Sequence, residues 1–578
     1  MSKTWKLKSE IPLGNEQSLG SYPKFFQQLL YNRDLLEPDE IEDFLNPKYE
    51  NLHSPFLFQD MQKAVDRIWG AIEEGQKITI YGDYDADAVT ANAVLQQTFR
   101  HLGVEVESYI PDRFSEGYGV NMEALQKIKD GGSKIIITVD CGTNSTDAAD
   151  FCNANGIDFI ITDHHEIIGD KPKAYALINP KNPDDKYPYH EITGVGVAFK
   201  LACGILEGSE RRGKGLFTLP PNPFPLTPSK GWEKWLLDLV AIGTVADCHS
   251  LMGENRLLVK FGLKVLAKTK WSGLRALMQV AAVDPSKAVD TYTLGFVIAP
   301  RLNAAGRLEH ANGALDLLMA PDSIIAQQKA ELLEQVNRRR QELTANIVSE
   351  AREQALLLKE RKILVLAGDW HKGVVGLVAG KLAEEFYRPV IVLEKTETFS
   401  TGSARTAGDF DVVEALKFAS EHLVRFGGHK QAAGLTLESS NLEKFYQKLL
   451  EYAEVNIKED ALPVLELETE LTASDLTPTS YNLQATLEPF GVGNAKPKYL
   501  ISSLQIASLK PVGQTGQHLQ MQFKSSGQFI SAICFNASNF VKTLKIGDTV
   551  DVAGELLLDE WNGNKRVKLR VIDVKLAQ

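Results

Sequence analysis

The sequence predicts an α/β protein: a parallel-sheet domain, joined by a long helix to a smaller α/β domain, with an all-β barrel of the OB type at the C-terminus. Three observations predict this class. Short apolar strands alternate with amphipathic helices from about residue 60. A helical pattern without Gly or Pro then runs from Ser323 to Lys359, and period-two alternation begins beyond Leu462.

The length and composition describe a multidomain globular protein. A chain of 578 residues exceeds the roughly 250 to 300 residues at which a single core stops growing, so we expect two to four domains. The formal charge of −12 argues against nonspecific coating of nucleic acid but leaves room for a nuclease with bases along one path. Neither a secretory signal nor an apolar run of ~20 residues is visible, which predicts a cytoplasmic protein without a membrane segment.

The predicted parallel sheet rests on four strands with helices between them. The strands are KITIY, VEVESYI, KIIITV and DFIIT, and the helices cover about 61–75, 88–103 and 121–130. Helical crossovers of this length join parallel strands. We place the segments as an N-terminal extension (1–60), the first α/β domain (61–320), a connecting helix (321–360), a second α/β domain (361–460) and a barrel domain (461–578).

Three further segments complete the expected organisation. The helix from Ser323 to Lys359 would be about 37 residues and roughly 55 Å long, enough to join two domains. A coiled-coil arm is the alternative, but three arginines at 338–340 interrupt its seam. The Pro-rich stretch 216–230 predicts a surface loop, and Asn562-Gly563 predicts a hairpin turn in the barrel.

Acids and histidines follow four apolar runs that we interpret as strands. They are Asp83, Asp85 and Asp87 after KITIY; Asp140 after KIIITV; Asp163, His164 and His165 after DFIIT; and Asp247 after LLDLVAIGTVA. In an open parallel sheet, ligands bind beyond the carboxyl ends of the strands. Clustered carboxylates repel one another unless a cation neutralises them, so the pattern predicts a divalent-metal site.

A calcium-binding loop and helix capping are the alternatives to this metal site. The DxDxD pattern from Asp83 resembles the start of an EF-hand loop, but the sixth position is Ala88 instead of Gly and the twelfth is Val94 instead of Glu. Each acid could instead cap the helix that follows. Capping would account for one or two of the acids. Acids at the ends of four predicted strands, with histidines next to them, favour a metal-binding site.

The ligand types indicate which metal to expect. Carboxylates suit Mn²⁺ or Mg²⁺, and imidazole shifts the preference towards Mn²⁺. Two ions about 3.5–4 Å apart could share a carboxylate, activate water and stabilise the leaving oxygen of a phosphodiester. Asp140 is our candidate for the shared carboxylate.

Several motifs resemble those of a known family. GDYDADAVT, TVDCGT, TDHH and GTVAD are similar to the motifs of the DHH phosphoesterase superfamily, which is named after the triplet at 163–165. APRLNAAGR, WHKGVVGLVAGKL, GSART, FGGHKQAAG and LEPFGVGN narrow the resemblance to the RecJ family of single-strand-specific 5′ to 3′ exodeoxyribonucleases, across nearly the whole chain.

The resemblance implies roles for particular residues. The metal ligands would be Asp83, Asp85, Asp87, Asp140, His164 and Asp247, and the catalytic residues would be Asp140, His164 and His165. The substrate would be bound by Arg113, Arg301, Asn303, Arg307, Ser403, Arg405 and His429, with the 5′ phosphate near Ser403 and Arg405. Arginine forks and a seryl hydroxyl suit phosphate oxygens. His429 could equally be a structural turn histidine.

The C-terminal domain and three departures from the family pattern add further expectations. Trp561, Lys568 and Arg570 could supply an auxiliary DNA contact, although an ordinary solvated barrel face is nearly as good an interpretation. Ala88 and Ala404 stand where the family usually has Gly, and Thr406 replaces a common Ser. A methyl group at 88 or 404 matters if the backbone there needs a positive φ.

We therefore expect a Mn²⁺- or Mg²⁺-dependent exonuclease that degrades single-stranded DNA to mononucleotides in repair and recombination. We expect a monomer, with a helicase and a single-strand-binding protein as candidate partners. Two alternatives stay open: a DHH-type phosphodiesterase acting on nanoRNA or cyclic dinucleotides, and an inactive nucleic-acid-binding scaffold. The presence of residues 463–578 argues against the phosphodiesterase. The complete set of Asp and His residues argues against the inactive scaffold.

Overall fold

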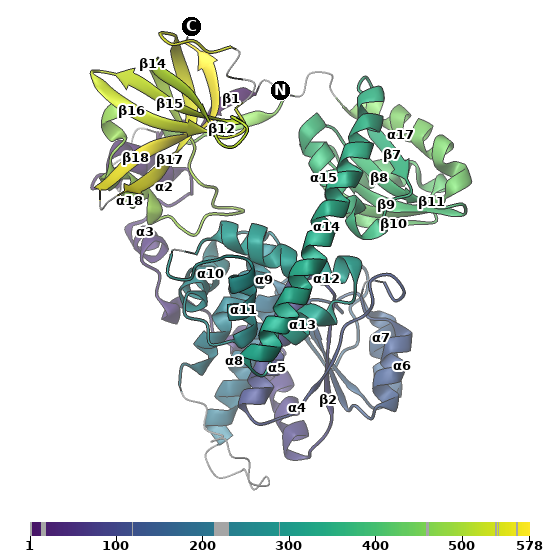
Figure 1. Ribbon diagram of the computed structural model, residues 1–578. Coiled ribbons are helices and arrows are strands. Elements are labelled where there is room, and N and C mark those ends of the chain that lie inside the picture. The colour runs from purple at the N-terminus through teal and green to yellow at the C-terminus, as the bar shows by residue number, and fades with distance from the viewer. Residues whose placement is uncertain are drawn as a thin grey trace. The chain divides into compact units, whose positions relative to one another are not determined.

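The structure is a computed structural model that describes residues 3–12, 19–117, 119–212, 230–287, 289–457, 462–537, 540, 543–561 and 564–577 (Figure 1). The chain forms two compact units. The first contains Ser54–Asp247 and Gly262–Pro463, and the second contains Lys3–His53, Cys248–Phe261 and Val464–Gln578. Among the described residues, no helix has both the length and the apolar character needed to cross a bilayer.

The first unit contains the predicted parallel sheet. Its strands are β2 (Ile78–Gly82), β3 (Glu107–Tyr109), β4 (Ile135–Val139), β5 (Asp158–Thr162) and β6 (Ala176–Ile178), and their order is β3-β2-β4-β5-β6. Every pairing is parallel. The central strands are buried along their length, which explains their continuous apolar sequence. The four predicted strands are confirmed, whereas β6 is too short to stand out in the sequence.

Helices cover both faces of this sheet. They are α4 (Met61–Glu73), α5 (Ala86–His101), α6 (Met122–Asp130), α7 (Thr146–Ala154) and α8 (Gly194–Arg212). Figure 1 shows α6 and α7 on one side of the sheet and α4, α5 and α8 on the other. One core cluster joins α6 and α7 to the strands through Leu125, Ile128, Cys152 and Phe159.

A helical layer follows the sheet and corrects one prediction. Its elements are η3 (Trp232–Leu236), α9 (Leu237–Ala246), α11 (Ser272–Val280), η4 (Thr293–Ile298), α12 (Ala299–Leu308) and α13 (Asn312–Leu318). Helix α10 (Gly253–Leu266) begins in the second unit and ends in the first. The run LLDLVAIGTVA, which we interpreted as a strand, forms α9. It is buried on nearly all sides, so it carries no helical periodicity, and Gly243 lets it approach Thr90 of α5 and Val195 of α8.

The predicted long helix is α14 (Ser323–Leu357), which contains 35 residues. The carboxylate of Asp322 caps it by accepting the N–H groups of Ile324 and Ile325. Helix α14 contacts α11, α12 and α13 with its N-terminal part and α15 (Lys372–Phe386) and β7 (Leu364–Gly368) with its C-terminal part (Figure 1). It therefore joins the first sheet layer to a second α/β layer, as predicted.

The second α/β layer is built on a mixed sheet. Its remaining elements are β8 (Val390–Lys395), β9 (Phe399–Arg405), α16 (Val412–Phe418), β10 (Arg425–His429), β11 (Ala432–Glu438) and α17 (Leu442–Asn456). The strand order is β10-β11-β9-β8-β7; only β7 and β8 pair in parallel. The sheet carries one apolar cluster on α16 and α17 and another on α14 and α15.

The second unit contains the predicted barrel. Strands β14 (Tyr499–Val512), β15 (His518–Ser525), β16 (Gln528–Cys534), β18 (Asn564–Leu576) and β17 (Thr549–Trp561) are neighbours in that order, and β14 also pairs with β17, which closes the sheet on itself. The short elements of this unit are β1 (Thr4–Leu7), α2 (Lys24–Tyr31), α3 (Pro38–Leu45), β12 (Val464–Leu467), β13 (Thr469–Glu470) and α18 (Pro478–Ala485). Residues of α2 and α3 share the barrel's apolar core.

Two predicted features fall outside the described residues. Asn562 and Gly563, the expected hairpin turn, are among them, although β17 and β18 pair up to Trp561 and Asn564 on either side. The expected Pro-rich loop 216–230 is also outside the described residues except for Lys230.

Candidate metal centre and nucleic-acid interface

Strand β2 and helix α5 place three acids around one turn. Asp83 follows β2 directly, and Asp85 caps α5 because its Oδ1 accepts the N–H groups of Asp87 and Ala88 at 2.9 and 3.1 Å. The capping alternative therefore applies to Asp85. Asp87 is buried, and its two oxygens accept N–H groups of Gly194 and Val195 at the start of α8. Asp83 is also buried, and its Oδ1 has no hydrogen-bond partner.

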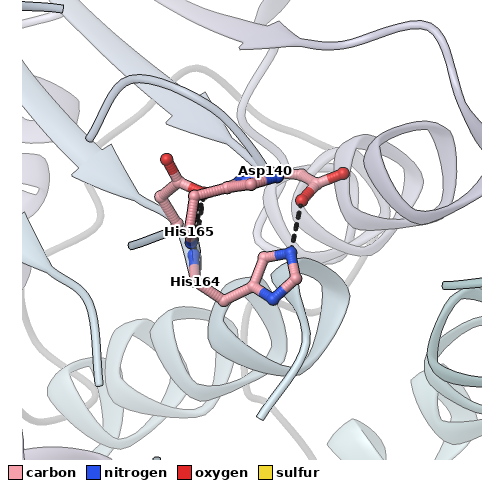
Figure 2. A group of neighbouring side chains, drawn as sticks. Asp140, His164 and His165 are labelled. Atoms are coloured by element: carbon pink, nitrogen blue, oxygen red, sulfur yellow. Dashed lines mark hydrogen bonds and ion pairs between the residues drawn. The ribbon is translucent and has the colours of Figure 1, made fainter. Parts of the chain in front are cut away.

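Asp140 and His164 meet beyond the ends of β4 and β5. Asp140 adopts a φ of 58°, in the left-handed region that Asp tolerates better than most residues. Its Oδ1 lies 3.0 Å from Nε2 of His164, and Figure 2 shows the carboxylate facing the imidazole ring. Both side chains are buried. Gly194 is required beside them, because a Cβ there would lie 2.5 Å from Oδ1 of Asp140.

Asp163 orients His165 and is a functional candidate that our predicted site omits. Its Oδ1 lies 2.7 Å from Nδ1 of His165 and accepts the N–H of His164 at 2.7 Å, and its Oδ2 accepts the N–H of Thr143 at 2.9 Å. A carboxylate on one ring nitrogen fixes the tautomer and leaves the other nitrogen available. The ligand atoms of Asp140, Asp163, His164 and His165 all lie within 4.8 Å of one another.

Asp247 reaches the centre from a helix, not from a strand. It is the C-cap of α9, and its Oδ2 lies 3.6 Å from Nε2 of His164. A carboxylate at the negative end of a helix dipole is unfavourable without a nearby cation. Asp247 and Asp140 therefore both lie beside Nε2 of His164.

The electrostatics indicate a site built for cations. Burial and the charge of Asp85 raise the pKa of Asp87 to about 7. Burial, with Asp87 and Asp85, raises the pKa of Asp247 to about 9. The pKa values of Asp83 and Asp140 are raised for the same reasons. Asp163 differs from these acids. Burial acts to raise its pKa, but the hydrogen bond to His165 acts in the opposite direction, and the pKa of Asp163 is lowered.

The donor set fits divalent cations. Carboxylate oxygens with an imidazole nitrogen are ligands of Mn²⁺ and Mg²⁺, and the buried, unpartnered Oδ1 of Asp83 is the kind of group that a bound ion satisfies. The residues that would hold the ions are Asp83, Asp85, Asp87, Asp140, His164 and Asp247, with His165 adjacent.

Three predicted phosphate-binding arginines form a cationic group in the first unit. Burial, together with the charges of Arg113, Arg340 and Arg405, lowers the pKa of Arg307 to about 10. Arg405 donates to the hydroxyl of Ser403, and burial and Arg113 lower its pKa. Arg113 lies 4.9 Å from the ring of Tyr84, next to Asp85. Cations held together in this way favour a polyanion between them.

Two other predicted substrate residues make structural contacts. Arg301 pairs with Glu334 of α14 at 2.7 Å and donates to the carbonyl of Val297 at 2.7 Å. The Oδ1 of Asn303 accepts the N–H of Ala86 at 2.8 Å, at the start of α5. Both residues therefore hold α12 against its neighbours, and these contacts leave a direct role in substrate binding as a prediction.

Arg340 of α14 is not a solvated surface residue. It is half-buried, its Nη2 donates to Oδ1 of Asn337 at 2.7 Å, and its Nε is buried without a hydrogen-bond partner. Arg338, by contrast, is exposed and pairs with Glu334 at 3.0 Å. The missed signal was Asn337, a polar residue on the buried face of α14.

The remaining predicted contacts lie on two surfaces. His429 is exposed on the edge strand β10. In the barrel, Lys568 pairs with Asp559 at 2.5 Å, and Arg570 lies 5.9 Å from the ring of Phe535, which is 48% exposed. The side chain of Trp561 is outside the described residues.

The two alanines that stand where the family usually has glycine cause no backbone strain. Ala88 lies in the first turn of α5, and Ala404 lies in β9. Neither residue has a positive φ. The expected difficulty with a methyl group at these positions therefore does not arise from the backbone.

Comparison with known families agrees with this architecture. The chain matches the DHH family, N-terminal domain over residues 77–244, the DHHA1 domain over 360–455 and the RecJ OB domain over 467–573. A parallel sheet that gathers acids around an Asp-His-His triplet thus belongs to the DHH class of proteins.

Full-length comparisons identify the family within this class. The chain is 37% identical to "Single-stranded-DNA-specific exonuclease RecJ" of Bacillus subtilis over 95% of its length and 68% of the relative, and 31% identical to the protein of the same name from Haemophilus influenzae over 97% of each. A crystal structure of RecJ with Mn²⁺ from Thermus thermophilus superposes with a TM-score of 0.83 at 29% identity, covering 100% of this chain and 80% of that one. A second structure, with Mg²⁺, gives a TM-score of 0.77 at 28% identity, covering 100% of this chain and 79% of that one.

The chain belongs to the RecJ family of single-stranded-DNA-specific exonucleases. These relatives support the exonuclease interpretation and give no support to a nanoRNA or cyclic-dinucleotide phosphodiesterase or to an inactive scaffold.

Proposed function

We propose that this protein is a metal-dependent exonuclease that degrades single-stranded DNA from the 5′ end to mononucleotides, in DNA repair and recombination. One observation carries the proposal: acids and histidines from β2, β4, β5 and α9 converge beside the arginine group of Arg113, Arg307 and Arg405. A metal centre next to bound phosphates is the arrangement that phosphodiester hydrolysis requires.

The ions would be Mn²⁺ or Mg²⁺, two of them, with Asp140 as the candidate shared ligand. When bound, such ions lower the pKa of water and neutralise charge that develops on the phosphodiester. Asp163 holds His165 in one orientation beside the ligands. The closely packed acids would hold the ions at a fixed place relative to the arginine group.

The arginine group would position the strand. Arg405 and Ser403 would bind the 5′ phosphate, with Arg307 and Arg113 on the following phosphates. Hydrolysis would join the oxygen of water to the first internal phosphorus and release the 3′ oxygen of the terminal nucleotide, which takes a proton. The shortened strand then again ends in a 5′ phosphate, so the same residues can bind it.

Several finer assignments belong to this proposal. The exposed ring of Phe535 beside Arg570 supports an auxiliary DNA contact in the barrel. His429 would contact substrate from the edge of the second sheet. A helicase and a single-strand-binding protein remain candidate partners, and we infer a cytoplasmic monomer.

Digestion of labelled oligonucleotides tests the proposal. Single strands labelled at the 5′ or the 3′ end, and the matching duplex, would be incubated with Mn²⁺, Mg²⁺ or chelator. We expect immediate release of 5′-labelled mononucleotide from single strands, no activity in chelator and little on blunt duplex. Cleavage from the 3′ end, or activity that persists in chelator, would contradict the proposal.

A further inference from the structure

Two large aromatic side chains face solvent beside the candidate site. Tyr292 is 63% exposed and Phe296 is 70% exposed, and their rings stack with centroids 4.8 Å apart and an interplanar angle of 23°. Leu294 and Ile298 of the same segment are completely buried. The segment is therefore anchored in the core, while the two rings stack on each other and leave their outer faces and edges accessible to a further ring.

The segment that carries the rings packs close to the metal centre. Tyr292 precedes η4, a π-helical turn, and such turns are rare and often occur at functional sites. A Cβ on Gly295 would lie 3.4 Å from Cγ1 of Val245, which stands two residues before Asp247. Helix α9 thus connects η4 directly to one of the candidate metal ligands.

Further arginine side chains lie between the proposed phosphate-binding arginines and this segment. The carbonyl of Val297, next to Phe296, accepts a hydrogen bond from Arg301 at 2.7 Å. Burial and the charge of Arg301 lower the pKa of Arg340. The charge of Arg340 in turn contributes, after burial, to the lowered pKa of Arg307. Helix α12 follows η4 without a break, so Arg307, Arg301 and the aromatic pair lie in this order from the C-terminal to the N-terminal end of one continuous helical segment, and Arg405 lies near Arg307.

We propose that Tyr292 and Phe296 form a base-stacking platform for single-stranded DNA, which holds nucleotides on the 3′ side of the bond that is hydrolysed. The proposal rests on the exonuclease function proposed above. If Arg405 binds the 5′ phosphate, the aromatic pair lies at the opposite end of the row of arginines, where the rest of the strand must leave the site.

The chemistry of the pair fits an unpaired strand. Every base has a π face, so stacking on aromatic rings holds a strand without reading its sequence. Arg301 is already paired with Glu334, so the attraction for the backbone of the same strand comes from Arg307 and Arg405 further along the path. A duplex keeps its bases stacked on one another, so the platform also favours single strands.

The test compares variants that keep or lose the aromatic rings. The double variant Tyr292→Ala/Phe296→Ala removes the platform, Tyr292→Phe/Phe296→Tyr retains it, and Phe399→Ala removes another exposed ring, which is 47% exposed. Binding is measured in chelator by fluorescence anisotropy of a 5′-phosphorylated dT₂₀ with a 3′ dye. We expect the alanine variant to bind about 5- to 150-fold more weakly, the range that stacking gives per base, and the other two to match the parent.

Substrate length separates this inference from the proposed function. On a 5′-phosphorylated dT dinucleotide, the alanine variant should retain the parent's kcat/KM, while kcat/KM on dT₂₀ should fall. Equal losses on both substrates, or parental binding of dT₂₀, would overturn the platform. A parent that degrades neither substrate would instead refute the exonuclease proposal.

A fluorescent base tests the direction of the strand. In the parent, we expect 2-aminopurine to be quenched by the platform at nucleotides internal to the strand, and this quenching should disappear in the alanine variant. Loss of quenching only at the 5′-terminal nucleotide would overturn the assignment to the 3′ side.

Discussion

Nε2 of His164 lies 3.0 Å from Oδ1 of Asp140, although the two residues follow different strands. Both side chains are buried, so neither can turn to solvent without moving the strand ends. This contact marks the point where the candidate ligands from separate segments converge.

The first prediction concerns Asp140. Asp140→Asn should lower the rate on 5′-labelled single strands with Mn²⁺ by more than about 100-fold, because even partners of metal ligands typically contribute about 10- to 100-fold. The matched control is Asp150→Asn, an exposed acid on α7, which should leave the rate unchanged. An Asp140→Asn protein as active as the parent would exclude Asp140 as a ligand.

The second prediction concerns the stability of the ion-free protein. Asp83 is buried, its Oδ1 lacks a hydrogen-bond partner, and burial with Asp85 raises its pKa. Asp83→Asn should therefore raise the melting temperature in chelator at pH 8, by about 2 °C or more, while reducing the stabilisation by Mn²⁺. A lower melting temperature in chelator would show that Asp83 stabilises the fold without an ion.

The third prediction is a pH dependence with a definite sign. The pKa values of Asp87 and Asp247 are raised to about 7 and about 9 in the folded protein, so the folded state binds more protons than the unfolded state above about pH 4. The free energy of unfolding in chelator should therefore fall as pH rises from about 4 through 7 towards 9.

Bound cations should reverse this loss, because they bind the ionised carboxylates. The increase in melting temperature produced by Mn²⁺ should thus be larger at pH 8 than at pH 6. Differential scanning fluorimetry at several pH values, with Mn²⁺ or chelator, measures both effects. An increase that is independent of pH would mean that these acids do not hold the ions.

The fourth prediction concerns recognition of the 5′ end. Arg405→Ala should reduce activity on 5′-phosphorylated strands by roughly 10-fold or more, because a charge-assisted hydrogen bond to phosphate contributes about 1.5–3 kcal/mol. Activity on 5′-hydroxyl strands should change less. Arg352→Ala, which breaks an exposed ion pair with Glu385 on the same unit, serves as the control. Equal losses on both kinds of 5′ end would place the phosphate elsewhere.

Much of the sheet and of the site is predictable from the sequence. Buried parallel strands appear as continuous apolar runs, and their carboxyl ends meet at one edge, so Asp83, Asp140 and His164 could be placed together in advance. The barrel strands were likewise visible, because alternation with period two reflects one buried and one exposed face.

Other parts depend on contacts that no local pattern records. Helix α9 is buried all round, so its sequence did not reveal a helix and Asp247 was assigned to a strand end. Asn303 accepts the N–H of Ala86, at the start of α5, from a position 217 residues away in the chain. Arg340 is half-buried because α14 packs against α12, and a surface arginine has the same sequence appearance.

The most direct test of the account is anomalous diffraction from a crystal soaked in Mn²⁺, recorded at the manganese edge. We predict two peaks about 3.5–4 Å apart, bounded by Asp83, Asp85, Asp87, Asp140, His164 and Asp247. An ordered crystal without a peak among these side chains, or with manganese bound only elsewhere, would contradict the metal centre and the hydrolysis proposed from it.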